Sequence, residues 1–246
     1  MNQKTKFAFL LLTALLYIFS ILMIETVADP VGTVITNVST VTGAATPASR
    51  VDDGGTISIL QINVTQQNYA WKAYVGNISA TLTLDDNNGY TIYDWSLVQG
   101  SLAGELYVTR NASSSWSGIA CASGSTIDTE LNSINMSPSD GDTINTTFNH
   151  VNHSSMVLAG TTIDNSTCRA LHTYYNGSSQ GDDETSYYEE ILIQNTNGNL
   201  IYVTNLEADK TSYVNDSFTY DFQLLVAEDD RASQITTYYF YAEIDS

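Results

Sequence analysis

The stretch 190–206 reads EILIQNTNGNLIYVTNL, two apolar runs joined by a polar turn. The runs 190–194 and 200–206 are rich in Ile, Leu, Val and Tyr, which suit the pleated surface of a β-sheet. Asn197-Gly198 stands between them, and both residues tolerate a positive φ. An Asn-Gly pair between apolar runs is a strong short-range signal for a tight turn. We therefore predict an antiparallel hairpin at this point of the chain.

A second hairpin of the same kind is predicted earlier in the sequence. Ala80 to Leu84 and Tyr90 to Trp95 flank Asp85-Asp86-Asn87-Asn88-Gly89. The segment 82–95 aligns without gaps with 191–204 at an offset of 109, and the Asn-Gly pair, an Ile and a Tyr coincide. This echo either records two related β units or reflects what any Asn-Gly hairpin requires. We favour the second interpretation.

Short β-rich runs bounded by turn residues fill most of the remaining chain. Two runs near the C-terminus are expected to pair as a long hairpin across Glu228-Asp229-Asp230-Arg231. This spacing predicts a mainly β fold, an antiparallel β-sandwich of the Ig-like or jelly-roll-like type. The predicted runs are Ile57–Val64, Trp71–Val75, Leu106–Thr109, Met156–Leu158, Leu171–Tyr175, and the C-terminal pair Phe218–Ala227 and Ile235–Ile244.

Two short helices are predicted within residues 125–150. Ile127, Leu131 and Ile134 recur at the spacing of one helical face. Ser137 followed by Pro138 has the form of a second helix start, because Ser can cap the helix and Pro suits its first position. The sandwich is thus expected to carry two helices as an insertion.

The N-terminus predicts export. Two lysines precede the uncharged apolar run 7–24, and a small residue, Ala28, follows at a suitable cleavage point. The run of 18 residues is also long enough to span a membrane. Residues 1–28 are therefore either a signal peptide or an N-terminal hydrophobic helix that anchors the chain. Residues 29–55 read as a Thr/Pro/Gly-rich extended lead-in, and 56–246 as a single β-rich extracellular domain.

The composition excludes one class of partner. The chain of 246 residues has 27 acidic and 8 basic side chains, a formal charge of −19. Such a chain repels phosphate, which argues against nucleic-acid binding. Calcium prefers oxygen ligands from loops, so weak calcium binding is a hypothesis for the acidic clusters, and no other cofactor is expected. These clusters are Asp52-Asp53, Asp85-Asp86, Asp140 with Asp142, Asp182-Asp183-Glu184 and Glu228-Asp229-Asp230.

Glycosylation sequons are the most specific motif in the chain. Composition alone gives about 4.6 Asn-x-Ser/Thr sites, whereas the sequence has 10. The excess and the export signal together predict a coat of N-linked glycans facing solvent. The sites are Asn37, Asn63, Asn77, Asn111, Asn135, Asn145, Asn152, Asn165, Asn176 and Asn215.

The two cysteines, Cys121 and Cys168, predict one disulfide in an exported chain. Two buried thiols are the alternative. No nucleophile elbow or phosphate-binding loop occurs in the sequence, so we expect no catalytic residues and no enzyme.

Two further residue sets have competing interpretations. His150 and His153 are too few for a convincing metal site, and His153 is expected at the surface because it lies inside a sequon. Trp71, Trp95 and Trp116 could form a sugar platform. The runs around Trp71 and Trp95, however, have the pattern of core strands.

Four segments resemble uncharacterised archaeal cell-surface proteins, which are N-glycosylated, β-rich, and surface-layer-like or filament-forming. The segments are Trp71–Asn77, Ile92–Trp95, Ser115–Cys121 and Thr236–Tyr241. The resemblance implies a structural glycoprotein of the envelope that self-associates or binds other envelope proteins, as a surface-layer or fibre subunit. It implies no catalytic or metal-binding residues.

Two alternative functions stay open. A type IV pilin-like filament subunit also has an N-terminal apolar helix before a β head, and residues 7–24 could contact the membrane. The chain departs from that pattern, because no Gly or Ala precedes the apolar run and the early helix has no Glu. A carbohydrate-binding adhesin would instead use Trp side chains and loop acids. All three functions place the protein at the cell surface or outside the cell.

Overall fold

The computed structural model describes residues 29–40, 61, 68–96, 102–112, 114–181, 183–229, 231 and 234–245. The predicted signal or anchor at 1–28 lies outside these residues, as do Asn63 and all of the run 57–64 except Gln61. Neither described helix has the length and apolar character of a membrane span.

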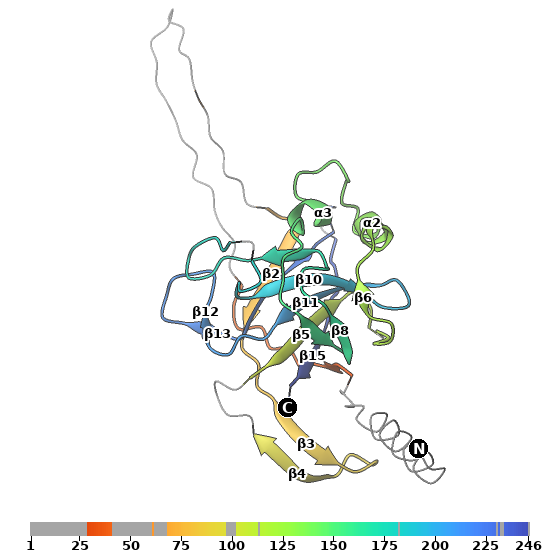
Figure 1. The fold of residues 1–246 in the computed structure, drawn as a ribbon, viewed down its shortest axis with the longest axis vertical. Helices are drawn as coiled ribbons and strands as arrows, with labels where there is room; N and C mark the ends of the chain where they lie inside the picture. Colours follow the sequence, from red (N-terminus) through yellow and green to blue (C-terminus); the bar gives the residue numbers. More distant parts are fainter. Residues whose placement is uncertain are drawn as a thin grey trace, which may run out of the picture.

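A seven-stranded antiparallel sheet forms the body of the protein (Figure 1). Its path is β1-β15-β5-β11-β10-β6, and β9 also pairs with β10. The described part of the chain is mainly β, as predicted. The strands of this sheet are β1 (Val31–Gly32), β5 (Gly104–Thr109), β6 (Ala120–Cys121), β9 (Ala170–His172), β10 (Glu189–Gln194), β11 (Leu200–Asn205) and β15 (Tyr239–Ile244).

The hairpin β10–β11 lies at the centre of this sheet, in agreement with the sequence. Ile191 pairs with Val203 and Ile193 with Ile201, and all four side chains are fully buried. On one side β5 pairs with β11, and on the other β6 and β9 both pair with β10. The residues 191–193 of β10 and 200–203 of β11 are therefore all apolar, because both faces and both edges of the hairpin are covered.

One face of the sheet packs against a second β layer and two helices. Leu192, Tyr202 and Val108 point to this side and join a cluster with Leu224 of β14. The covering elements are the antiparallel pair β14 (Phe222–Ala227) and β2 (Trp71–Gly76), with α2 (Gly124–Ser133) and α3 (Ile144–Thr147). The opposite face packs against the hairpin β7 (Met156–Leu158) and β8 (Thr161–Ile163).

The two short helices are confirmed, but the second begins later than predicted. Ser137 does not cap it: the Asp140 carboxylate accepts from the Ser137 backbone N–H at 3.1 Å and closes a turn there. The helix starts six residues on, where the Thr143 hydroxyl accepts from Thr146 N–H at 3.2 Å. The Trp71 indole N–H donates to the Asp142 carbonyl at 2.7 Å, which holds the intervening segment against β2.

The predicted C-terminal hairpin is wrong. β14 pairs with β2, whereas β15 pairs with β5 and β1, so the two runs lie in different sheets. The first run is also broken at Asp221, whose carboxylate accepts backbone N–H groups from Ile78 and Asp209. Before this break, β13 (Thr219–Tyr220) pairs with β12 (Lys210–Thr211). Alternating patterns alone do not reveal which strands pair.

The predicted disulfide is confirmed. Cys121 and Cys168 are bonded, with their Cα atoms 4.9 Å apart and 47 positions apart in sequence. Cys121 ends β6 and Cys168 precedes β9, and both of these strands pair with β10. Closing a loop of this length contributes about 4 kcal/mol in the chain-entropy model. The bond therefore secures one edge of the central hairpin.

Candidate functional site

The hairpin formed by β3 (Thr81–Asp85) and β4 (Thr91–Ser96) projects from the body as a two-stranded sheet (Figure 1). Side-chain hydrogen bonds fix its turn. One Asp86 carboxylate oxygen accepts the N–H groups of Asn88 at 2.8 Å and Tyr90 at 2.9 Å. Hydrogen bonds from the Tyr90 and Asn88 N–H groups hold the pKa of Asp86 below its ordinary value. Gly89 takes a φ of +81°, as the predicted turn requires.

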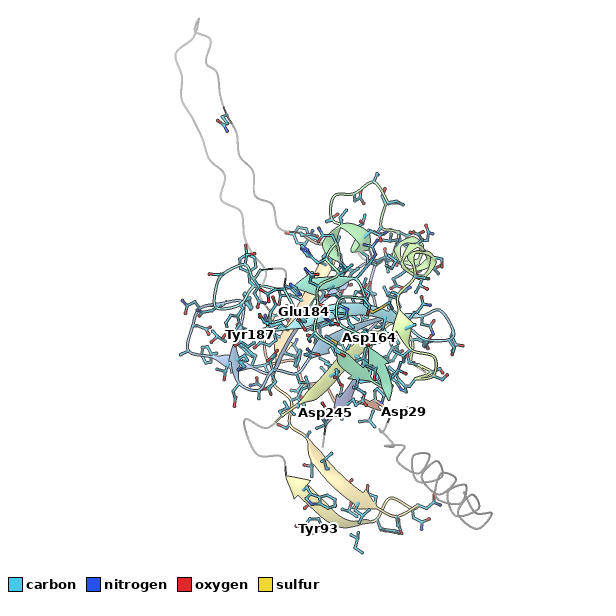
Figure 2. All side chains as sticks on the ribbon, in the orientation of Figure 1. Asp29, Tyr93, Asp164, Glu184, Tyr187 and Asp245 are labelled. Atoms are coloured by element: carbon cyan, nitrogen blue, oxygen red, sulfur yellow. A yellow bond between two sulfur atoms is a disulfide. The ribbon has the colours of Figure 1, made fainter. Side chains whose placement is uncertain are left out.

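One face of this hairpin is apolar. Leu82 lies opposite Trp95 and Leu84 opposite Tyr93, and directly opposed residues share a face. Tyr93 and Trp95 also contact each other edge to face, with ring centroids 4.8 Å apart. Figure 2 shows Tyr93 at the far end of the molecule from α2 and α3. This is the pattern of a half-buried hairpin.

The apolar side chains are nevertheless exposed. On this face Leu84 is 54% exposed, Tyr93 58% and Trp95 49%, and Leu82 is half-buried. Tyr93 and Trp95 alone leave roughly 160–270 Å² open, taking about 150–250 Å² for a whole aromatic residue. Within the described residues no strand pairs with the outer edge of β3 or β4. An uncovered apolar face beside two open strand edges is typical of a contact surface.

The three tryptophans do not form a common platform. Trp71 packs against Phe148, with ring centroids 6.2 Å apart, on the helix-covered side of the main sheet. Trp116 lies on the opposite side, between the rings of Tyr107 and Tyr241. Trp95 stands on the projecting hairpin. Its run was expected in the core, and the structure corrects this, because no described element packs over β3–β4.

The prediction that His153 lies at the surface is wrong, because its ring is fully buried. Nε2 accepts backbone N–H groups from Thr167 at 3.0 Å and Cys168 at 2.9 Å. Nδ1 lies 2.6 Å from the Ser154 carbonyl, so the ring proton sits on Nδ1. His153 thus secures the backbone beside the disulfide. The rings of His150 and His172 stack at 6.2 Å, and the described residues include no group of three or more metal-ligating side chains.

The described sequon asparagines all reach the surface to some degree. Asn37, Asn77, Asn135, Asn165, Asn176 and Asn215 are exposed, and Asn111, Asn145 and Asn152 are half-buried. The Asn165 amide donates to Glu184 at 2.7 Å. In the Asn152 sequon, the Ser154 hydroxyl is already engaged by the buried carboxylate of Glu189. The sequons thus differ in how open they are in the folded protein.

The described acidic clusters form hydrogen bonds or ion pairs with residues of their own loop or of one neighbouring segment. Asp183 accepts from the Thr185 hydroxyl and N–H, and this lowers its pKa. Asp229 pairs with Arg231 at 2.7 Å, which lowers the pKa of Asp229 to about 2. Asp142 accepts from the Asn68 amide at 2.7 Å. Each cluster uses its oxygens within its own loop or on one neighbour, as solvated loop acids do.

Sequence reasoning missed four buried glutamates in the main sheet. Glu105 and Glu243 lie directly opposite each other on β5 and β15, and Glu189 and Glu190 begin β10. Burial, with the nearby carboxylates of Asp245 and Glu243, raises the pKa of Glu105 to about 8. Glu105, Tyr107 and Thr109 alternate with Leu106 and Val108, a pattern typical of a strand with one face to solvent, and only the folded chain reveals that this face is buried.

The comparisons with known proteins do not indicate a function. No protein-family model matches this chain, and no curated protein or solved structure is detectably similar to it. The projecting hairpin is therefore the candidate site on structural grounds alone.

Proposed function

We propose that this protein is a non-enzymatic structural glycoprotein of the cell surface, and that it self-associates through the apolar face of β3–β4. The observation that carries the proposal is an amphipathic hairpin with no covering element among the described residues. An isolated two-stranded sheet is at best marginally stable in water. Covering Tyr93 and Trp95 with a partner would stabilise the hairpin and remove exposed apolar area from water.

A second copy of the chain suits this face. Thr83 and Asp85 are joined by a hydrogen bond of 3.1 Å, and Asp94 pairs opposite Thr83, so these polar side chains lie on the other face. Two hairpins packed through their apolar faces would therefore keep their acids apart despite the strongly acidic composition. Such a contact uses the same patch on both copies, as a two-fold interface requires.

The size of the patch indicates that one hairpin contact is weak. A stable interface buries about 800 Å² on each partner, and the aromatic residues of β3–β4 supply roughly a fifth to a third of that. Pairing along the open edges of β3 and β4 would add area and backbone hydrogen bonds. Many weak contacts of this kind suit a surface layer or a fibre, in which each subunit is held by several neighbours.

The body of the proposed subunit is an antiparallel β-sandwich. The packing of β14–β2 across the main sheet supports this, as do the two apolar clusters on either side of that sheet. The sequons and the acidic surface suit a protein that faces outward, and export would follow from residues 1–28. The disulfide between Cys121 and Cys168 suits an oxidising location outside the cell.

The test compares the full chain with the double variant Tyr93→Ser/Trp95→Ser. A matched control, Tyr213→Ser/Phe218→Ser, removes two aromatic side chains that are 53% and 64% exposed elsewhere. Sedimentation velocity and electron microscopy measure assembly over a range of concentrations. We expect the wild type and the control to assemble, and the hairpin variant to lose at least about tenfold in association constant. A wild type that stays monomeric, or three proteins that assemble alike, would refute the proposal.

A further inference from the structure

A shallow cavity of about 350 Å³ lies far from the projecting hairpin, between the segments 175–181 and 183–187. Two aromatic rings stand in its wall: Tyr175 and Tyr187 stack with centroids 4.4 Å apart and planes 29° from parallel. Figure 2 shows Tyr187 on the β12–β13 side of the body, well away from Tyr93. The remaining lining is polar and includes Ser178, Ser186 and Asp183.

The wall of this cavity is held by side chains beneath it. The Gln180 amide donates to the carbonyls of Thr173 at 2.7 Å and Tyr187 at 2.6 Å, and accepts from Tyr187 N–H at 2.8 Å. Gln223, 2% exposed, donates to the Tyr174 carbonyl at 2.9 Å. Lys210 Nζ lies 5.1 Å from the centre of the Tyr187 ring. The two tyrosines are thus positioned before any ligand binds, which lowers the entropy lost on binding.

The chemistry of the lining selects a neutral, hydroxyl-rich ligand. Aromatic rings offer an apolar surface to the C–H face of a pyranose, and serine hydroxyls with a carboxylate can bond its hydroxyl groups. Hydrogen bonds from the Thr185 hydroxyl and N–H lower the pKa of Asp183 below its ordinary value. The Asp183 carboxylate and the Lys210 ammonium, which lies 5.1 Å from the centre of the Tyr187 ring, carry opposite charges, so the cavity suits a neutral ligand better than an anion or a cation.

One sequon lies at the rim of the same cavity, and a second lies beside the turn that carries it. Asn176 lines it, at the tip of a two-residue turn that Tyr175 and Ser178 close through N–H···O bonds of 2.9 and 3.0 Å. Asn176 and Gly177 have φ values of +51° and +71°, as the Asn-Gly turn requires. A Cβ on Gly177 would lie 3.1 Å from Asn215 Cβ, so the second sequon touches this turn.

We propose that the cavity beside Tyr175 and Tyr187 seats a neutral hexose or N-acetylhexosamine. The sugar comes either from a glycan on Asn176 or from an unattached saccharide. The first source rests on the glycosylation included in the proposed function, whereas the second does not. In both cases the sugar ring lies against the tyrosine pair, and Asp183 and the serines accept or donate hydrogen bonds to its hydroxyls.

The experiment uses the full chain produced in a host that does not N-glycosylate, so that no glycan occupies the rim and the Asn176-Gly177 turn keeps its sequence. Saturation-transfer NMR is recorded with N-acetylglucosamine, glucose and galactose at about 10 mM, because a single-sugar contact of this kind binds in the millimolar range. Tyr187→Ser removes one wall of the cavity. Tyr174→Ser is the matched control, because Tyr174 is 55% exposed and does not line the cavity.

We expect transfer to at least one sugar, a loss of at least about threefold in Tyr187→Ser, and no loss in Tyr174→Ser. No transfer to any of the three sugars, or equal transfer in both tyrosine variants, would overturn the proposal. The same measurement on chain glycosylated at Asn176 separates the sources. Transfer that disappears there assigns the cavity to the attached glycan, and transfer that persists assigns it to an outside saccharide. Because monomeric protein suffices, the result is independent of whether the hairpin mediates assembly.

Discussion

The two Asn-Gly hairpins have nearly the same turn and opposite surroundings. In β3–β4 an Asp86 oxygen accepts the N–H groups of the residues two and four positions on, and in β10–β11 the Asn195 side-chain oxygen does the same. Yet Ile201 is fully buried, whereas Ile92, its counterpart at the offset of 109, is 80% exposed. Local sequence therefore sets the turn, and the neighbouring strands decide what the hairpin buries.

The neighbouring strands account for the whole difference in burial. β10–β11 lies beside β5 and β6 in the main sheet (Figure 1), β9 also pairs with β10, and each face of the hairpin has a packed apolar cluster. The described residues provide no such strands or clusters around β3–β4. Because of this contrast, we assign a structural role to β10–β11 and a role in assembly to β3–β4. It also predicts different responses to pH and to substitution.

The largest expected effect is on the main sheet, through pH. Glu105 on β5 is 6% exposed and faces Glu243 on β15, with Asp245 nearby, and Tyr107 donates to Glu243 at 2.5 Å. With a folded pKa of about 8 and an ordinary pKa near 4.5, the folded state keeps a proton that the unfolded state loses. The contribution of Glu105 to stability is therefore fully present below about pH 4.5 and is lost as the pH rises to about 8, by about 3–5 kcal/mol.

Urea unfolding at pH 4.5 and pH 8 measures this change, and Glu105→Gln is the matched variant. A neutral amide removes the proton linkage at this site, so the variant should lose less stability between the two pH values. Glu189 and Glu190, whose pKa values burial also raises, leave a residual slope in the same direction. A wild type that is equally stable at both pH values would contradict the assignment.

The next largest effect is the difference in unfolding free energy between substitutions at Ile201 and Ile92. Ile201→Ala deletes a fully buried side chain between β5 and β10, and we expect a loss of about 3 kcal/mol. Ile92→Ala removes a side chain that is 80% exposed, and should change the free energy of unfolding by less than about 0.5 kcal/mol. Denaturant unfolding of dilute, monomeric protein checks both. Similar losses would mean that the monomer also packs β3–β4 against its own chain.

The sequence predicted which segments form strands and helices better than it predicted which strands pair with each other. The two hairpins, α2 and the disulfide follow from local signals that tertiary structure left unchanged: Asn-Gly pairs, helical spacing and two cysteines. The pairing of β14 with β2 could not be predicted, because an alternating strand fits several neighbours equally well. The burial of His153 was missed for a similar reason. Its sequon indicates exposure, whereas the backbone N–H groups of Thr167 and Cys168 create a need for an acceptor inside the fold.

The sequence predicted the β3–β4 hairpin of the candidate site but not the exposure of its apolar face. Trp95 and Tyr93 read as core residues, because an amphipathic strand has the same pattern whether its apolar face meets its own chain or another one. The cavity at Tyr175 and Tyr187 gave no signal beyond the Asn176 sequon. It depends on the amide of Gln180, which joins residues seven positions away on either side.

The smallest effect concerns the one chemical difference between the two turns, a carboxylate at Asp86 and an amide at Asn195. Asn195 is 2% exposed, and its amide accepts both N–H groups without bringing a charge into the fold. Asn195→Asp should therefore cost about 2 kcal/mol at pH 7. This cost should shrink near pH 4, where the introduced acid takes up a proton. Asp86→Asn, in an exposed turn, should change stability by less than about 0.5 kcal/mol. Denaturant unfolding of both variants at the two pH values separates a cost of burying charge from a cost of altering the turn: if turn geometry alone decided, Asn195→Asp would be equally destabilising at pH 4 and pH 7.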